Sequence, residues 1–204
     1  MAETSGGRIE RRKEKTKQKI VTTALALFQQ YGFDATTMEQ IAEEADIAKG
    51  TLYNYFPAKE AIVGAYIQHS FRERNVARMQ QLQNISDTRS RMIFIFTALM
   101  EGVQAQKEIF EKYLVYQMQN MVSFRQSNQA TSGFYALAVE TIELGQANGE
   151  IRDDLPLYVL EDLFEFVFIE VVKQFYMEAE TFSVNDAIER GVDLFLHGTQ
   201  RTTP

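Results

Sequence analysis

Hydrophobic residues along the chain recur mainly at the spacing of an α-helix. In the first segment, the recurring positions are Ile20, Ala24, Leu27, Phe28 and Tyr31. This spacing predicts a helix over residues 9–31 with one buried face, and Gly32 suits the position just after a helix end. Residues 1–8 are mostly small and polar, so we expect them to form a disordered tail.

A capping motif predicts the start of a second, short helix. Thr37 and Gln40 have the spacing of a capping box, in which each side chain bonds to the backbone N–H of the other residue. Asp46 tolerates turn backbone and predicts the end of this helix. We expect Ile47, which follows, to point into the core.

A third short helix is predicted over residues 48–55, with Leu52 and Phe56 as its buried pair. Pro57 ends it, because the residue before a proline avoids helical backbone. A longer fourth helix is predicted over residues 59–83.

The remaining chain is predicted to be helical, with polar breaks between the helices. Phe164, Phe166 and Phe168 alternate as in a strand, but the longer window favours a helix. The predicted helices cover residues 88–105, 107–120, 122–147, 156–180 and 185–198.

Charge is distributed unevenly along the chain. The net charge is −7, yet residues 1–60 hold nine basic and nine acidic residues, and the remaining residues hold twelve and nineteen. Between Arg8 and Lys19, seven residues are basic and two are acidic. A polyanion would therefore bind at the N-terminal end, although such a run is also compatible with a solvated helix face.

Composition argues against several classes of protein. The chain has no cysteine and its only histidines are His69 and His197, so neither a disulfide nor a Cys-ligated zinc site is expected. No Gly-rich phosphate loop or nucleophile motif occurs, and we expect no cofactor, no metal and no enzymatic activity. The longest uncharged apolar run, residues 92–100, is too short to span a membrane, and the N-terminus lacks the apolar stretch of a signal peptide. We therefore expect a cytoplasmic protein with no membrane partner.

Residues 37–56, TMEQIAEEADIAKGTLYNYF, have the pattern of a helix-turn-helix, whose second helix enters the major groove of DNA. That helix is too short to be stable alone, so the neighbouring helices must support it. Its polar residues can bond to phosphates or base edges, although the two tyrosines are also compatible with a core position. The candidates are Lys49, Gly50, Thr51, Tyr53, Asn54 and Tyr55.

The segment GFDATTMEQIAEEADIAKGTLYNYFPAKEAI resembles the DNA-binding domain of TetR/AcrR-type transcriptional repressors, and the match extends over about residues 15–63. The chain departs from the family at Ala48, where serine is common, and at Asn54, where an aromatic residue is common. The resemblance implies a homodimer on palindromic double-stranded DNA. It assigns the six residues above to the recognition helix and makes Thr37 and Lys59 phosphate contacts.

The resemblance also implies an all-α architecture. A three-helix helix-turn-helix DNA-binding domain over residues 9–58 is joined by a long fourth helix to a C-terminal helical ligand-binding and dimerisation bundle within residues 59–204. Eighteen of the 24 aromatic residues follow residue 60, where they form either a core or an apolar pocket for a small-molecule effector. The pocket candidates are Phe94, Tyr113, Tyr116, Phe124, Phe134, Tyr135 and Phe168.

Residues 143–156 resemble the loop that precedes the family's last two helices, which form its dimer interface. We expect the interface on the last two predicted helices, with intramolecular packing as the alternative at each position. The candidates are Val167, Val171, Phe175, Ile188, Val192 and Phe195. Glu170 and Lys173 are spaced to form a surface ion pair.

The sequence thus predicts a repressor that a largely apolar or aromatic effector releases from DNA. The alternatives are an enzyme that uses the C-terminal bundle, or a helical adaptor whose helix-turn-helix binds protein.

Overall fold

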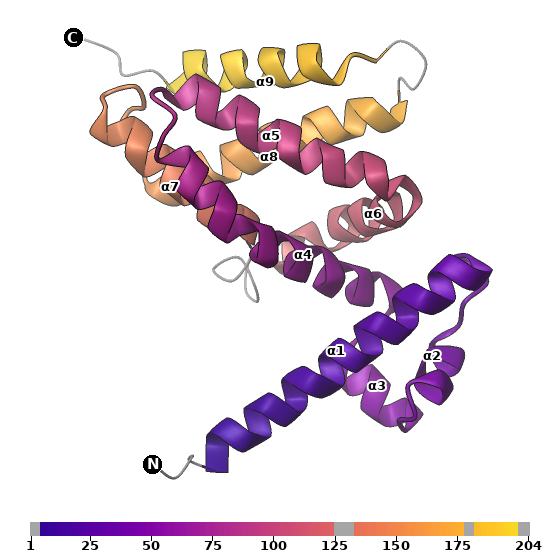
Figure 1. The fold of residues 1–204 in the computed structure, drawn as a ribbon. Helices are drawn as coiled ribbons and strands as arrows, with labels where there is room; N and C mark the ends of the chain where they lie inside the picture. The colour runs from indigo at the N-terminus through magenta and orange to yellow at the C-terminus, as the bar shows by residue number, and fades with distance from the viewer. Residues whose placement is uncertain (1–4, 125–132, 178–181, 200–204) are drawn as a thin grey trace. The chain divides into compact units, whose positions relative to one another are not determined.

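The computed structural model describes residues 5–124, 133–177 and 182–199, apart from the side chains of residues 5, 6, 71–73, 76, 120–124 and 199. These ranges are helices joined by short connections and contain no strand (Figure 1). The helices are α1 (Ser5–Tyr31), α2 (Met38–Glu44), α3 (Lys49–Tyr55), α4 (Lys59–Leu82), α5 (Thr88–Ala105), α6 (Lys107–Phe124), α7 (Gly133–Ala147), α8 (Leu157–Met177) and α9 (Val184–Thr199). The predicted all-α class is confirmed, and the alternating phenylalanines lie in a helix.

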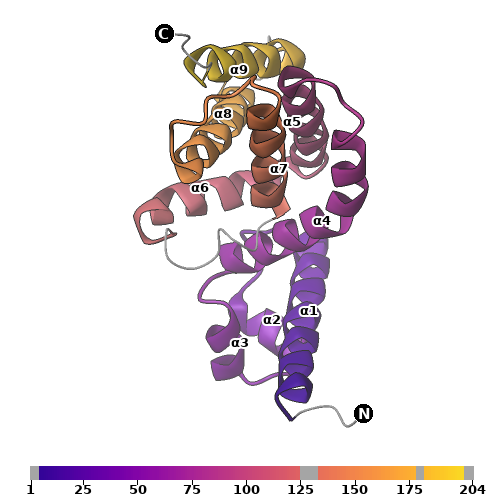
Figure 2. The ribbon, with the colours of Figure 1, turned by 90° about the vertical axis from the view of Figure 1, so that its left-hand side faces the viewer.

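The chain divides into two compact units. The first unit comprises Met1–Ile67 and the α6 segment Lys112–Gln119, and the second comprises Gln68–Glu111 and Asn120–Pro204. Helices α4 and α6 therefore contribute to both units, whereas the sequence placed a boundary after residue 58. Figures 1 and 2 show the short helices α2 and α3 packed beside the much longer α1.

The core of the first unit forms where α1 meets α2 and α3. Ile20, Ala24 and Phe28 of α1 are buried, as predicted, and the Phe28 ring lies 4.8 Å from that of Phe33. Tyr31, however, is 56% exposed, because the chain leaves the helix one residue later, at Gly32. Helix α1 also begins at Ser5, four residues before the predicted start, so the predicted tail over residues 1–8 is too long.

Phenyl rings fill the core of the second unit and join α5, α7 and α8. The Phe96 ring lies 4.9 Å from that of Phe164 and 5.5 Å from that of Phe168. The Phe134 ring is 5.7 Å from each of these α8 rings. Each such pair adds about 0.5–1.5 kcal/mol to what burial alone contributes.

The predicted break over residues 120–123 is wrong, because α6 continues to Phe124. An asparagine in a helix interior costs about 0.7 kcal/mol or less relative to alanine, so Asn120 does not end the helix. The predicted helix over residues 122–147 is observed from Gly133, and residues 125–132 lie outside the described part. Within the described ranges, each helix is too short or too polar to traverse a bilayer.

Candidate nucleic-acid interface

Helix α2 begins with the predicted capping box. The hydroxyl of Thr37 accepts a hydrogen bond from the backbone N–H of Gln40 at 3.1 Å, and the Gln40 carboxamide accepts one from the N–H of Thr37 at 2.8 Å. Both side chains are exposed, so this helix start is accessible from outside. The capping role of Thr37 is confirmed, and its contact with phosphate stays a prediction.

The turn between α2 and α3 depends on one residue with left-handed backbone. Ala45 ends α2, Asp46 has a φ of 50°, and the N–H of Ile47 donates to the carbonyl of Ala42 at 3.0 Å. Aspartate tolerates this conformation better than most residues. Ile47 is only half-buried and does not enter the core as predicted.

Helix α3 is anchored by its apolar side and presents its polar side to solvent. Leu52 is fully buried, and Phe56, just after the helix, is 3% exposed. The six predicted DNA contacts lie on the opposite side or at its edges. Lys49, Gly50, Tyr53 and Asn54 are exposed, and Thr51 and Tyr55 are half-buried.

Lys49 forms an ion pair with Glu39 of α2. The hydrogen bond between them lowers the pKa of the Glu39 carboxyl and raises the pKa of the Lys49 ammonium. The Lys49 Nζ also lies 5.9 Å from the centroid of the Tyr53 ring. The side chains of the pair are 59% and 54% exposed, and such exposed pairs contribute little to stability. Lys49 can therefore exchange Glu39 for a phosphate.

The ammonium of half-buried Lys59 is bonded to the protein's own backbone, which competes with the predicted phosphate contact. Its Nζ donates to the carbonyls of Phe33 and Thr36, both at 2.7 Å, and lies 4.6 Å above the Phe33 ring. A weaker bond, at 3.4 Å, reaches the carbonyl of Asp34. These carbonyls belong to the connection between α1 and α2 and have no helical partners. Lys59 therefore ties this connection to α4 and has no N–H left for phosphate.

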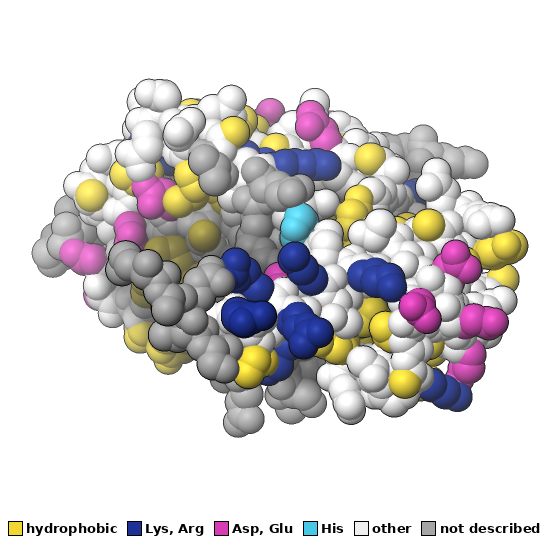
Figure 3. Space-filling view, turned by 60° about the horizontal axis from the view of Figure 1, so that its bottom comes forward, with side chains coloured by type: hydrophobic (Ala, Val, Ile, Leu, Met, Phe, Trp, Pro, Cys, Tyr) yellow, Lys and Arg dark blue, Asp and Glu magenta, His cyan; other side chains and the backbone are white. Residues whose placement is uncertain are grey.

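The basic residues of α1 lie largely on one face. Arg8, Arg12, Lys15 and Lys19 are separated by three or four residues and are all exposed. Helical spacing puts them roughly opposite Ile20, Ala24 and Phe28. Figure 3 shows Lys and Arg side chains gathered on the face that comes forward when the bottom of Figure 1 is turned to the viewer. Such a cluster attracts a polyanion.

The predicted pocket residues do not form one group. Phe134 and Phe168 belong to the aromatic core of the second unit, and Phe94 and Tyr135 are half-buried. Tyr113 and Tyr116 lie on the α6 segment that belongs to the first unit. There the Tyr113 ring packs on Gly64 of α4, where an added Cβ would lie 3.0 Å from Cε2. The side chain of Phe124 lies outside those described.

Most of the predicted dimer residues are buried inside the single chain. These are Val171, Ile188, Val192 and Phe195, each at most 4% exposed. They are buried because α9 packs against both α5 and α8. These four residues therefore pack within the chain, as the alternative has it, and a contact of any of them with a second chain stays a prediction. Val167 and Phe175 are half-buried.

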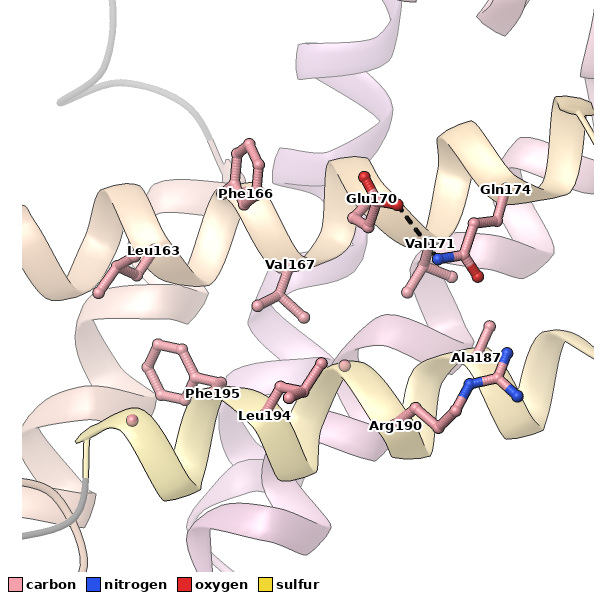
Figure 4. Close-up of a pocket in the computed structure, with 12 residues that line it drawn as sticks. Leu163, Phe166, Val167, Glu170, Val171, Gln174, Ala187, Arg190, Leu194 and Phe195 are labelled. Carbon is pink, nitrogen blue, oxygen red and sulfur yellow. Dashed lines mark hydrogen bonds between the residues drawn. The ribbon is translucent and has the colours of Figure 1, made fainter.

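The face of α8 and α9 that holds Val167, Val171 and Phe195 also carries exposed apolar side chains, which the sequence analysis missed. Leu163, Phe166 and Leu194 are 42%, 61% and 75% exposed. They line a groove of about 350 Å³ between the helices, toward which Val167 extends from α8 (Figure 4). Gly191 lets the helices approach, since an added Cβ would lie 2.9 Å from Val167. The helical spacing of Leu163, Phe166 and Val167 is the sequence signal from which this apolar face could have been predicted.

The surroundings of this groove are polar. Glu170 pairs with Lys173 at 2.5 Å, as predicted, and accepts a hydrogen bond from Gln174 at 3.2 Å. Arg190 lies on α9 beside the groove (Figure 4). Among the described residues, no three His, Cys, Asp or Glu side chains are placed to hold a metal ion.

Residues 20–66 match the family model of bacterial regulatory proteins of the tetR family. These residues include α2, α3, the C-terminal part of α1 and the start of α4. The helix-turn-helix segment of the chain is therefore similar to that of the tetR family. The resemblance noted from the helix-turn-helix sequence is thereby confirmed.

Similar curated proteins include HTH-type transcriptional regulators. YuxN of Bacillus subtilis, described as uncharacterized, is 33% identical over 103 residues, which are 50% of this chain and 35% of that protein. RutR of Escherichia coli is 46% identical over 52 residues, which are 26% of this chain and 24% of that protein. The chain thus spans about a third or less of these relatives' lengths.

Similar solved structures extend over nearly the whole chain. The TetR-family repressor FadR of Thermus thermophilus, in complex with lauroyl-CoA, has a TM-score of 0.72 and 23% identity, with 92% of this chain and 97% of that chain covered. RolR in complex with resorcinol has a TM-score of 0.65 and 16% identity, with 93% and 90% covered. The fold is therefore that of a TetR-family regulator, with a helix-turn-helix followed by a helical C-terminal domain.

Proposed function

We propose that this chain is a cytoplasmic TetR-family transcriptional repressor that binds palindromic operator DNA as a homodimer. A small, largely apolar or aromatic effector releases it from the operator. The observation that carries the proposal is the placement of α3, which buries Leu52 and Phe56 and exposes Lys49, Tyr53 and Asn54. A helix supported in this way can enter the major groove with its polar side chains foremost.

Charge supports DNA rather than protein as the partner of α3. The exposed basic face of α1 belongs to the same unit as α3. Lys49, at the start of α3, is held only by a solvent-exposed ion pair. DNA binding releases counterions for each phosphate contacted, so affinity falls steeply with salt.

The exposed groove of α8 and α9 supports the homodimer. Soluble monomers rarely expose neighbouring large apolar side chains such as Phe166 and Leu194 without a partner. A second copy of the same face would cover them and would leave the polar residues at the rim. Two copies of α3 could then bind successive major grooves, about 34–36 Å apart.

The effector is assigned to the second unit because aromatic rings fill it. Solved structures of this fold include one bound to lauroyl-CoA and one bound to resorcinol. Both ligands carry an apolar or aromatic portion. An apolar effector would pack between α5, α7 and α8, and would act by binding one conformation of the dimer more tightly than the other.

Selection of bound duplexes from a random DNA library by the purified full chain tests the proposal. We expect an enriched palindrome, bound with an affinity that falls steeply as salt is raised. An adaptor or an enzyme would enrich no sequence, and its weak DNA binding would be independent of the palindrome. That outcome would contradict the proposed function.

A further inference from the structure

Two polar side chains of α4 are buried inside the second unit. Asn75 and Arg78 are each 8% exposed. They are three residues apart and therefore lie on one face of the helix. Arginine is almost never buried unless it is paired, so this face requires an explanation.

Arg78 makes only part of the bonds that a buried guanidinium needs. Its Nη2 donates to the carbonyl of Ala98 on α5 at 3.1 Å, and its Nη1 has no hydrogen-bond partner. Among the described residues, no carboxylate lies within ion-pair distance of it. Desolvation and the nearby Arg74 lower the pKa of Arg78, and the Glu101 carboxylate partly opposes this. Because a guanidinium stays charged at neutral pH, α4 carries a buried cation that forms no ion pair with a described residue.

Asn75, on the same face of α4, is a second buried side chain whose hydrogen bonds are only partly formed. Its Nδ2 donates to the carbonyl of Gly133 at the start of α7, and its Oδ1 has no partner. Buried water could satisfy the hydrogen bonds of both residues. Water would leave the charge of Arg78 uncompensated, and an unpaired buried charge is strongly unfavourable.

The apolar surroundings of this pair are the phenyl rings of the same unit. Phe134 follows Gly133 directly, and its ring contacts those of Phe164 and Phe168. Phe96 contacts the same two rings from α5, two residues before Ala98. The backbone partners of Asn75 and Arg78 are thus one and two residues away in sequence from rings of this aromatic cluster on α5, α7 and α8.

We propose that Arg78 binds the anionic group, a carboxylate or a phosphate, of an effector whose apolar body packs against these rings. The inference rests on the proposed function in that it takes the ligand of this unit to be the effector. The inference goes beyond the proposed function in two respects: the effector carries a negative charge, and Arg78 recognises that charge. Helix α4 begins at Lys59 in the unit that holds α3, so the anion would bind a helix that is shared by the two units.

Three probes that each contain ten carbons test the charge: decanoate, decyl phosphate and the neutral decanol. The readout is the midpoint of thermal unfolding of the full chain, since a ligand that binds the folded state raises it. We expect one or both anions to raise the midpoint well above the effect of decanol, and the stronger anion identifies the headgroup. Equal shifts with all three probes, or no shift with either anion, would overturn the proposal.

Arg78→Met removes the charge and keeps an apolar stem, and Arg74→Met, at an exposed position one turn earlier on α4, is the control for loss of a nearby charge. We expect Arg78→Met to unfold at the same or a higher temperature without ligand, because a buried unpaired charge is removed. Its affinity for the anion should fall by about tenfold or more, whereas Arg74→Met should lower that affinity much less. Neither substitution should change the binding of decanol. Wild-type anion affinity in Arg78→Met would overturn the proposal.

Arg78→Lys covers the case in which Arg78→Met fails to fold. We expect it to keep the charge and a measurable preference for the anions over decanol. Loss of stability in both variants, with no such preference in Arg78→Lys, would show a purely structural role and overturn the proposal.

A DNA titration separates this inference from the proposed function. We expect the preferred anion to release wild-type protein, but not Arg78→Met, from the selected operator duplex. If the wild type bound no operator while the anion still bound through Arg78, the regulator would be contradicted and the anion site would stand. Operator binding without a preference for anions would instead support the regulator and overturn the anion site.

Discussion

The ammonium of Lys49 on α3 is paired with the carboxylate of Glu39 on α2. The pair joins the two helices of the helix-turn-helix across their exposed surface. It also means that Lys49 must leave a carboxylate before it can bind a phosphate. The free protein thus holds one of its DNA-binding groups in a competing contact.

Glu39→Gln should therefore increase affinity for operator DNA. The substitution removes the competing charge, and we expect a gain of about twofold to tenfold at low salt, measured by fluorescence anisotropy with a labelled duplex. Glu43→Gln, at another exposed acidic position of α2, is the control for net charge. An equal gain in both variants would show that the ion pair itself has no effect.

Gly50→Ala should change stability and DNA binding in opposite directions. A Cβ at Gly50 would meet no heavy atom within 4 Å, so alanine fits and stabilises α3 by up to about 1 kcal/mol. If DNA approaches α3 here, the methyl group occupies space that the duplex needs. We expect higher stability by urea unfolding together with weaker operator binding. Unchanged operator affinity would place the duplex away from Gly50.

Lys59→Met should destabilise the first unit by about 1–3 kcal/mol, because it leaves the carbonyls of Phe33 and Thr36 without their partner. Urea unfolding measures this loss. Since Lys59 holds no phosphate, the salt dependence of DNA binding should keep its slope. Lys15→Met, on the exposed basic face, should lower that slope by about one and leave stability unchanged. A lowered slope in Lys59→Met would restore Lys59 as a phosphate contact.

Leu194→Glu should convert the dimer to a monomer. The side chain is 75% exposed on the groove of α8 and α9, and a carboxylate there would be buried without a partner in a dimer. Light scattering coupled to size-exclusion chromatography gives the mass. Tyr158→Glu, exposed on α8 outside the groove, is the matched control and should leave the dimer intact. A dimer that persists in Leu194→Glu would place the interface elsewhere.

Local signals in the sequence predicted the helices and the helix-turn-helix well. Thr37 and Gln40 form the capping box that their spacing predicts, and Leu52 is buried as its position in α3 requires. These features depend on residues a few positions apart, so their physics is contained in short segments. The beginning of α1 and the continuation of α6 were missed because helix ends depend on small differences in propensity.

Contacts between distant segments could not be predicted in the same way. The role of Lys59 depends on carbonyls of Phe33 and Thr36, and nothing near Lys59 in sequence indicates them. Ile188 and Val192 lie on an apolar face that either a second chain or α5 and α8 could cover, and only the packed structure decides. The burial of Arg78 without an ion-pair partner could not be predicted either, because it depends on the helices that pack around it.

The central claim is that α3 binds the major groove through the side chains it exposes. Titration of the selected operator with wild type and with Tyr53→Ala tests it most directly, with circular dichroism and mass measurements as controls for fold and dimer. Because Tyr53 is 43% exposed, we expect an intact dimer with operator affinity reduced about tenfold or more. Wild-type affinity in a correctly folded Tyr53→Ala dimer would contradict the claim.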